Sequence, residues 1–152
     1  MELDHIDRRI LEMLQKSGRM SNAELSEVVN LSPSACHRRV QRLEADRYIR
    51  DYVALLDPKK VNRPTTVFVE ITLSGQADEV LDAFEKAVAR VPDVLECHLM
   101  AGTADYLLKV VAGDTEDFAK IHRRYLATLP GVAQMQSSFA LRTVRNTTAL
   151  PV

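Results

Sequence analysis

The apolar residues of this chain recur at helical spacing in its first third and mostly at strand spacing after that. Leucine and isoleucine occupy every third or fourth position from Leu3 to Leu14, which predicts an amphipathic helix. Asp4 suits its N-cap, and the helix is expected to run to about Lys16. Gly18 then closes it, as glycine often does just beyond a helix.

Two further helix starts lie close together, separated by a tight turn. Ser21 and Glu24 form a capping box, in which hydroxyl and carboxylate each satisfy a backbone donor. Ser32 before Pro33 marks the second start, because serine caps well and proline suits the first helical position. Asn30 tolerates the left-handed backbone that a reversal between them requires. Two helices around a tight turn are typical of a helix-turn-helix DNA-binding motif.

The second of these helices, predicted from Pro33 to Asp46, has a packed face and a polar outer face. The packed face carries Cys36, Val40 and Leu43, and the outer face carries Ser34, His37, Arg38, Gln41 and Arg42. Residues 32–50 hold five arginines against two acidic residues, a local charge of +3, whereas the whole chain is at −1. A basic face on a nearly neutral chain favours phosphate contacts. The alternative is a solvated charged helix with no DNA partner.

Arginine side chains are the main candidates for contact with DNA. Arg38 and Arg42 are expected to reach bases or phosphates. Arg39 lies nearer the packed face and is expected to reach backbone or a neighbouring carboxylate. The DNA-binding candidates together are Ser21, Asn22, Ser32, Ser34, His37, Arg38, Arg39, Gln41 and Arg42.

After the third helix the pattern changes, and residues 48–56 have the strand propensity of a wing or a connecting strand. Pro58 and Pro64 then interrupt regular structure, because the residue before a proline is kept out of the helical region. We place the domain boundary between these prolines. This gives a helix-turn-helix domain over residues 1–60 and a second domain over residues 61–152.

The second domain is predicted to alternate strands and helices. Strands are expected over 65–73, 94–101, 105–111 and 132–145, and helices over 78–91 and 114–129. This order predicts a ferredoxin-like βαββαβ fold, with both helices on one face of an antiparallel sheet. The fold class is therefore α+β, with a winged helix-turn-helix domain followed by a ferredoxin-like domain.

The face of that sheet without helices combines apolar and polar side chains. It would present Phe68, Glu70, Thr72, His98 and Met100. A mixed face of this kind is more readily covered than left in water, which predicts a homodimer with two sheets face to face. Dimerisation also suits the first domain, because recognition helices on a two-fold axis address half-sites about 34–36 Å apart.

Composition bears on the size of the core, on membrane association and on the state of the cysteines. The 152 residues are 46% hydrophobic, enough for a sizeable core. No apolar run approaches the roughly 20 residues of a membrane span, and the N-terminus lacks the apolar segment of a signal peptide. We therefore expect a cytoplasmic protein with no membrane partner. Cys36 and Cys97 are expected to be small buried hydrophobes rather than a disulfide.

Short segments along nearly the whole chain form a specific set. In the first half they are Leu3–Asp7, Asn22–Ser26, Leu31–Pro33, Arg38–Glu44 and Tyr52–Pro58; in the second half they are Val67–Thr72, Glu96–His98, Gly102–Leu108 and Leu129–Val132. In this order and spacing they resemble the Lrp/AsnC, or feast/famine, transcription regulators. The chain departs from the usual family pattern at Asn30, Ala35 and Ala104. The small Ala104, where a bulky aromatic is frequent, is expected to widen the effector pocket.

The resemblance implies an N-terminal DNA-binding domain joined to a C-terminal effector-sensing domain of the type called RAM. It implies binding to double-stranded DNA by dimers that commonly assemble into octamers. It also implies effectors that are amino acids or related metabolites, bound between dimers. The predicted function is thus a sequence-specific transcriptional regulator whose DNA binding or oligomeric state responds to such a metabolite.

The loop before the third strand of the second domain is the candidate effector site. Gly102 permits close backbone approach, and exposed N–H groups there suit a carboxylate. Asp105 suits an ammonium group, and Thr103 adds a hydroxyl. The alternative is a hairpin turn in which Asp105 bonds local backbone; the family resemblance favours the effector. With residues added by analogy from a neighbouring dimer, the set is Met100, Ala101, Gly102, Thr103, Ala104, Asp105, Tyr106, Gln134, Gln136 and Ser138.

Catalytic and metal chemistry find little support in the sequence. Strand alternation sends Cys97 to the opposite face from Glu96 and His98, and no Cys or His pair has a zinc-like spacing. We expect no enzymatic activity, cofactor or metal. Two alternatives stay open: a small ferredoxin-like enzyme built around Asp105 and His98, and an architectural protein that wraps DNA without responding to a metabolite.

Overall fold

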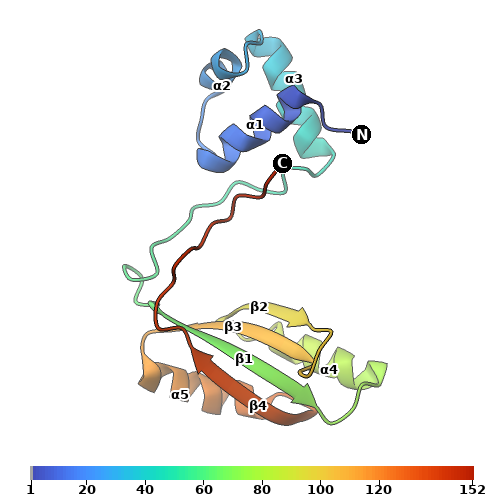
Figure 1. Cartoon of the computed structure of the whole chain (residues 1–152), viewed down its shortest axis with the longest axis vertical. Coiled ribbons are helices and arrows are strands. Elements are labelled where there is room, and N and C mark those ends of the chain that lie inside the picture. The colour runs from blue at the N-terminus through green and yellow to red at the C-terminus, as the bar shows by residue number, and fades with distance from the viewer. Residues whose placement is uncertain (1) are drawn as a thin grey trace. The chain divides into compact units, whose positions relative to one another are not determined.

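The computed structural model describes residues 2–152, which form two compact units (Figure 1). One unit holds the chain up to Leu55 together with Arg145–Val152, and the other holds Leu56–Val144. The division falls slightly before the boundary that the prolines suggested, and the assignment of the C-terminal segment to the first unit was not predicted. In the described part of the chain, no helix is long and apolar enough to cross a membrane.

Three helices make up the first unit: α1 (His5–Lys16), α2 (Asn22–Val28) and α3 (Pro33–Ala45). The side chains of Asp4, Ser21 and Ser32 accept hydrogen bonds from backbone N–H groups of the first turns, as the sequence predicts. The chain reverses between α2 and α3 through Asn30, whose φ of 54° is the predicted left-handed conformation. Gly18 has no positive φ, so α1 ends without the expected glycine cap.

The helices of the first unit meet on a small apolar core. Ile10, Cys36 and Leu43 are fully buried, and Leu25 from α2 is nearly so. Cys36 and Leu43 belong to the predicted packed face of α3 and lie two turns apart along it. Their burial leaves the other side of α3 facing solvent.

The predicted strand over residues 48–56 is wrong. This segment is irregular in the structure, and Val53 and Leu55 are each 71% exposed. A strand needs a neighbour that bonds its backbone groups. Within residues 2–152 the single sheet is built from other segments, so these backbone groups have no ladder to join.

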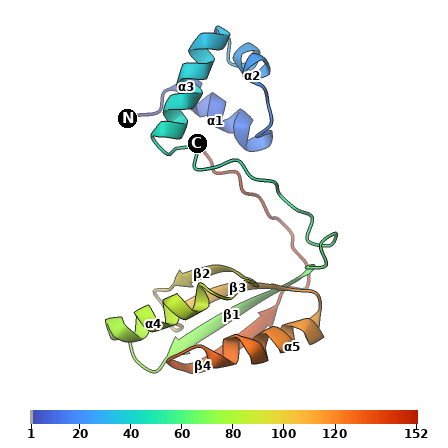
Figure 2. The same ribbon diagram turned by 180° about the vertical axis from the view of Figure 1, so that it is seen from behind.

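The second unit contains an antiparallel sheet with helices on one face (Figure 2). Its elements are β1 (Thr65–Leu73), α4 (Asp78–Val88), β2 (Val94–Leu99), β3 (Tyr106–Ala112), α5 (Thr115–Arg124), a short 3-10 helix (Leu126–Thr128) and β4 (Val132–Phe139). The strand order β2-β3-β1-β4 is that of the predicted ferredoxin-like fold.

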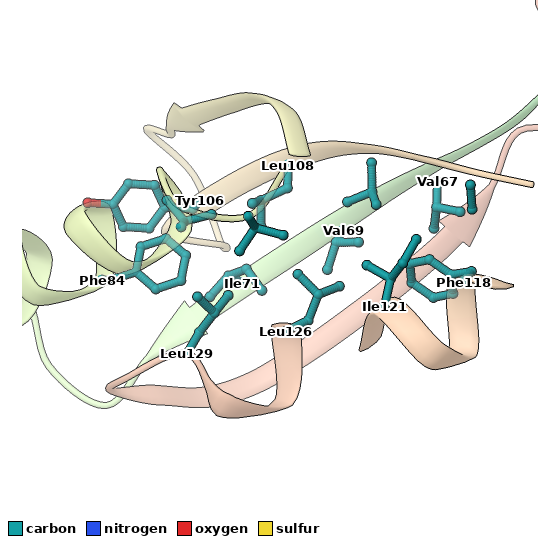
Figure 3. Close-up of a cluster of buried hydrophobic side chains, with 14 of the residues drawn as sticks. Val67, Val69, Ile71, Phe84, Tyr106, Leu108, Phe118, Ile121, Leu126 and Leu129 are labelled. Carbon is teal, nitrogen blue, oxygen red and sulfur yellow. The ribbon is translucent and has the colours of Figure 1, made fainter. Parts of the chain in front are cut away.

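Alternation along β1 separates a buried face from an open one. Val67, Val69 and Ile71 are fully buried between the sheet and the helices, whereas Phe68 is 39% exposed on the other side. Figure 3 shows the buried side chains gathered along the helix-covered face. This confirms the predicted faces of the strand.

Some elements end before the predicted residue. β4 stops at Phe139, which pairs with Val67, rather than near 145; the Ala140 N–H still bonds the Thr66 carbonyl, and β1 itself begins at Thr65. The predicted helix over 114–129 starts with Asp114 as its cap and is regular only to Arg124, after which it tightens into the 3-10 turn.

The expectation that both cysteines are buried holds for Cys36 only. Cys97 is exposed. It lies on β2, the edge strand next to β3, and every residue of that strand after Val94 is exposed. Its position at the edge, rather than its residue type, sets its exposure.

Candidate nucleic-acid interface and effector site

The solvent side of α3 presents one arginine that has no partner among residues 2–152. At 100° per residue, Ser34, Arg38 and Gln41 lie opposite the buried Cys36 and Leu43. All three outward residues are exposed. Among residues 2–152, none forms a hydrogen bond or ion pair with the Arg38 side chain. Its guanidinium is therefore available to a base or a phosphate.

The other two arginines of α3 are bound to acidic residues of α1. Arg39 Nη1 lies 2.7 Å from Asp4 Oδ2 and 2.8 Å from Asp7 Oδ1. Arg42 Nη2 lies 2.8 Å from both carboxylate oxygens of Asp7. The expectation that Arg39 reaches a neighbouring carboxylate matches this geometry. Arg42, expected to reach bases or phosphates, bonds Asp7 at the side of the helix, and its side chain remains 43% exposed.

Three other DNA-binding candidates stabilise the motif itself. The Ser21 hydroxyl donates to Glu24 Oε2 at 2.9 Å, and Asn22 Nδ2 donates to the carbonyl oxygen of Pro33 at 2.8 Å. Ser32 Oγ accepts from the backbone N–H of Ala35 at 3.3 Å. The Asn22 bond joins the start of α2 to the start of α3, which fixes the tight turn between them.

His37 and Gln41 border a small hollow of about 210 Å³ between the three helices. Tyr52, from the segment after α3, closes one side and donates from its hydroxyl to Glu44 Oε1 at 2.8 Å. Burial and the Glu44 carboxylate raise the pKa of Tyr52 to about 12. Sequence analysis did not single out Tyr52, because its contact with Glu44 depends on an irregular path of the chain.

The effector loop is organised by Asp105. This residue is only 9% exposed, and its Oδ2 accepts from the backbone N–H of Leu73 at 2.7 Å. Oδ1 accepts from Gln76 Nε2 at 2.9 Å. Both oxygens therefore already have partners, as in the hairpin-turn alternative, although the partners come from the end of β1 and the loop after it.

Gly102 sits at an open part of the same loop. A side chain built there would meet nothing within 4 Å, and the residue has no positive φ. Neither crowding nor backbone strain within this chain requires a glycine. The free space beside Gly102 is where a ligand or a second copy has room.

The β4 candidates lie on the open face of the sheet. Gln134, Gln136 and Ser138 are exposed and pair in register with Thr72, Glu70 and Phe68 of β1. Only Gln134 is near the end of the sheet that carries the loop, because the Asp105 backbone N–H bonds the Ile71 carbonyl next to Thr72. Ser138 lies four residues farther along β4, so one copy does not gather the whole set.

A hollow between α4 and β2 was not anticipated. It has a volume of about 440 Å³ and is lined by Glu85, Val88, Leu95, Cys97, Leu99 and Tyr106 among others. Tyr106 donates to Glu85 Oε1 at 2.6 Å, and burial followed by this bond raises the pKa of Tyr106 well above its usual range. Leu99 and Tyr106 flank the effector loop on its two sides.

The polar residues of β2 form an exposed pair rather than a catalytic group. His98 Nε2 lies 3.1 Å from Glu96 Oε2, and Lys109 Nζ lies 3.7 Å from Glu96 Oε1. Hydrogen bonding from His98 and the charge of Lys109 lower the pKa of Glu96. In the described part of the chain, no three His, Cys, Asp or Glu residues are placed to hold a metal ion.

Two family models cover most of the chain. The Lrp/AsnC ligand binding domain matches residues 66–150, and a winged helix-turn-helix DNA-binding domain matches residues 3–50. The leucine-responsive regulatory protein of Escherichia coli K12 is 42% identical over 151 residues, which are 99% of this chain and 92% of that protein. The protein of the same name from Klebsiella pneumoniae shows the same identity and coverage.

Solved structures agree over nearly the full length. A transcriptional regulator from Neisseria meningitidis in complex with L-methionine has a TM-score of 0.93 and 39% identity, covering 99% of this chain and 97% of that one. An AsnC family regulator from Agrobacterium tumefaciens has a TM-score of 0.94 and 40% identity, with 98% and 97% covered. These relatives are transcription regulators rather than enzymes. This chain belongs to the Lrp/AsnC family of DNA-binding transcriptional regulators, with an effector-binding C-terminal domain.

Proposed function

We propose that α3 reads DNA in the major groove and that Arg38 makes its main contact. The observation that carries this assignment is the contrast among the three arginines of α3. Arg39 and Arg42 are bound to acids of α1, whereas Arg38 is exposed and has no partner within residues 2–152. An unpaired guanidinium on the outward side of the helix suits a guanine edge or a phosphate.

Ser34 and Gln41 flank Arg38 on the same side and complete the proposed contact surface. Ser21, Asn22 and Ser32 hold the motif together through their caps and the α2–α3 bond. In the proposed complex these three residues contact only nearby phosphates. Such contacts orient the protein on the duplex but do not recognise its base sequence. His37 and Arg42 lie at the two margins of the surface.

We propose an apolar amino acid as the effector, with L-methionine and L-leucine as the first candidates. One relative was solved with L-methionine, and others are leucine-responsive by name. The residues from Met100 to Tyr106 would hold it, together with Gln134, Gln136 and Ser138 of another copy. Open space at Gly102 supports this location. Because the Asp105 carboxylate is already bonded, its role is to shape the loop, and the exposed loop backbone meets the ligand.

We also propose that the open sheet face forms a homodimer. Phe68 is 39% exposed on that face, and Met100, which directly follows the end of β2, is 42% exposed. Octamers built from such dimers would bring Gln134, Gln136 and Ser138 of one dimer to the loop of another. The protein would act in the cytoplasm, with the DNA that it binds.

The direct test is a gel shift of the DNA upstream of its own gene, with and without L-methionine or L-leucine. We expect a specific shift whose mobility or midpoint changes with the L-amino acid and not with its D-enantiomer. A shift that ignores both amino acids favours the architectural alternative. Absence of any specific shift contradicts DNA reading by α3.

The effector location has its own test. Gly102→Leu adds a side chain where the chain itself leaves room, so it is expected to fold normally and to lose a thermal shift induced by L-methionine. Ala127→Leu, an enlargement that is one carbon smaller, at an exposed position of the 3-10 helix, serves as the control. An L-methionine response that survives Gly102→Leu would place the effector elsewhere.

A further inference from the structure

Two acids of α1 and two arginines of α3 form a closed ionic cluster in the first unit. Asp4 is the N-cap of α1 and Asp7 lies in its first turn, and Arg39 and Arg42 are one turn apart on α3. Three of the four possible pairs are made, at 2.7 to 2.8 Å. We call these four residues the Asp–Arg cluster.

Asp7 is the centre of the Asp–Arg cluster. Its side chain is 1% exposed, whereas the side chains of Arg39 and Arg42 are 26% and 43% exposed. A carboxylate this deeply buried is stable only when it is paired and hydrogen-bonded. Removing its charge would leave two guanidinium groups side by side with one partner fewer.

Apart from the Asn22–Pro33 hydrogen bond at its first turn, α3 packs on the other helices through apolar side chains. Cys36 and Leu43 anchor α3 in the core. Apolar burial is not directional. It therefore opposes separation of α3 from the core more than it opposes rotation of α3 about its own axis. Hydrogen bonds from a planar guanidinium to a carboxylate are directional. The Asp–Arg cluster therefore sets how far Arg38 turns toward the DNA.

The Asp–Arg cluster also removes positive charge from the DNA-binding surface. Of the three arginines on α3, two are neutralised by Asp4 and Asp7, and Arg38 alone keeps its charge unpaired among the described residues. Unpaired basic groups bind phosphates of any sequence. Pairing Arg39 and Arg42 within the protein therefore lowers affinity for DNA in general more than affinity for a preferred site.

We propose that Asp7 is a specificity-determining positioning residue: through Arg39 and Arg42 it fixes the rotation of the recognition helix and withholds their charge from non-specific DNA. The proposal rests on the proposed reading of DNA by α3. Asp7 itself touches no DNA. Its effect appears in the ratio of specific to non-specific affinity rather than in affinity alone.

The test uses the full-length protein and two DNA duplexes. One is a duplex selected by the wild-type protein from a random pool, and the other is a mixed-sequence duplex of equal length. Fluorescence anisotropy gives Kd for both over a series of KCl concentrations. Asp7→Asn keeps the size of the side chain and an oxygen that accepts hydrogen bonds, but it removes the charge.

For Asp7→Asn we expect the specificity ratio to fall roughly tenfold. Binding to the mixed duplex is expected to stay equal or become tighter, with a steeper dependence on salt, by roughly 0.9 in the log–log slope for each phosphate gained. A ratio unchanged within roughly twofold, or equal weakening on both duplexes, would overturn the proposal.

The matched control is Glu12→Gln. Glu12 is also on α1 and pairs with Arg9 at 3.1 Å, in a bond exposed to solvent. The substitution changes the net charge by the same amount but leaves the Asp–Arg cluster intact. Its specificity ratio is expected to match the wild type, which separates the cluster from a general charge effect.

A second variant decides the matter if Asp7→Asn fails to fold. Arg42→Lys keeps the charge but replaces the planar guanidinium, whose plane fixes the direction of the bonds from Nη2 to the Asp7 oxygens, with an ammonium group that rotates freely. Arg42→Lys is expected to lower the ratio of specific to non-specific affinity as well. In a folded double variant, Arg42→Lys is expected to cause no decrease beyond that of Asp7→Asn alone. A normal ratio in Arg42→Lys counts against the proposal.

Arg38→Ala separates failure of this proposal from failure of the proposed function. If α3 does not read DNA, Arg38→Ala leaves affinity for the selected duplex unchanged. If α3 reads DNA but Asp7 has no positioning role, Arg38→Ala weakens binding and Asp7→Asn leaves the ratio intact.

Discussion

The carboxylate of Asp105 holds the backbone N–H of Leu73 at 2.7 Å, which joins the effector loop to the end of β1. The two residues are 32 positions apart in the chain. The bond lies in a buried setting, where an unmatched donor is costly. The loop is therefore attached to the sheet before any ligand arrives.

Asp105→Ala is expected to destabilise the second unit. Loss of the carboxylate leaves the Leu73 N–H unsatisfied, at a cost of about 1–3 kcal/mol in the free energy of unfolding. Urea denaturation of the ligand-free protein measures it. Gln76→Ala removes only the more exposed partner of Asp105 and is expected to cost less. Equal stability of Asp105→Ala and the wild type would show that the bond is dispensable.

Arg38→Ala is expected to weaken DNA binding without destabilising the fold, because the side chain has no partner within residues 2–152. If Arg38 reads a guanine, binding of Arg38→Ala to the preferred site is weaker by about 1–3 kcal/mol. The variant then also discriminates less between bases at the one base pair that Arg38 contacts. If it holds a phosphate, all duplexes weaken alike. Competition binding against singly mutated sites distinguishes the two. Arg38→Lys restores the phosphate contact only.

The capping bonds of Asp4 predict a pH dependence of stability. Backbone bonding to the Asp7 N–H and the hydrogen bond from Arg39 lower the pKa of Asp4 to about 2, from an unfolded value of 3.8. Because the folded pKa is the lower one, this stabilisation is complete above about pH 4 and is lost as the pH falls toward about 2. Thermal melts between these limits are expected to decline less steeply in Asp4→Asn. Identical slopes would assign the acid sensitivity to other carboxylates.

The two cysteines are expected to differ sharply toward a thiol reagent. Cys97 is exposed and Cys36 is fully buried, so one thiol per chain reacts in the native protein and both react after denaturation. Partial desolvation of the thiol by the residues around it, and the nearby Glu85, raise the pKa of Cys97, so its reaction is slow at neutral pH and accelerates in alkaline solution. An aromatic disulfide reagent releases a coloured thiolate when it reacts. Its absorbance measures both the number of reactive thiols and the pH dependence of the reaction rate. Cys97→Ser is expected to abolish the native reaction.

Phe68→Asp is expected to disrupt the proposed homodimer. It places a charge in the middle of the open sheet face, beside Lys109 and Ser138 in register, where a second sheet would have to desolvate it. Sedimentation equilibrium at micromolar concentration is expected to show dimers or larger assemblies for the wild type and monomers for the variant. Thr66→Asp, at the margin of the same face, is expected to be milder. A monomeric wild type would contradict the dimer.

Local sequence determined the helices and the four strands of the sheet, and the start of each helix in the first unit. The caps at Asp4, Ser21 and Ser32 and the left-handed turn at Asn30 depend on a side chain and the backbone within a few residues, so spacing alone predicts them. The alternation along β1 likewise fixed which side chains enter the core.

Only the tertiary structure decided which polar groups are free. Arg42 looks as exposed in sequence as Arg38, yet α1 supplies Asp7 to bind it. Asp105 looks like a free loop acid, yet β1 supplies a backbone donor. The segment over residues 48–56 has strand propensity but no strand beside it within the described chain. In each case the partner lies far away in the chain or is missing from it, and a local pattern carries no information about such partners.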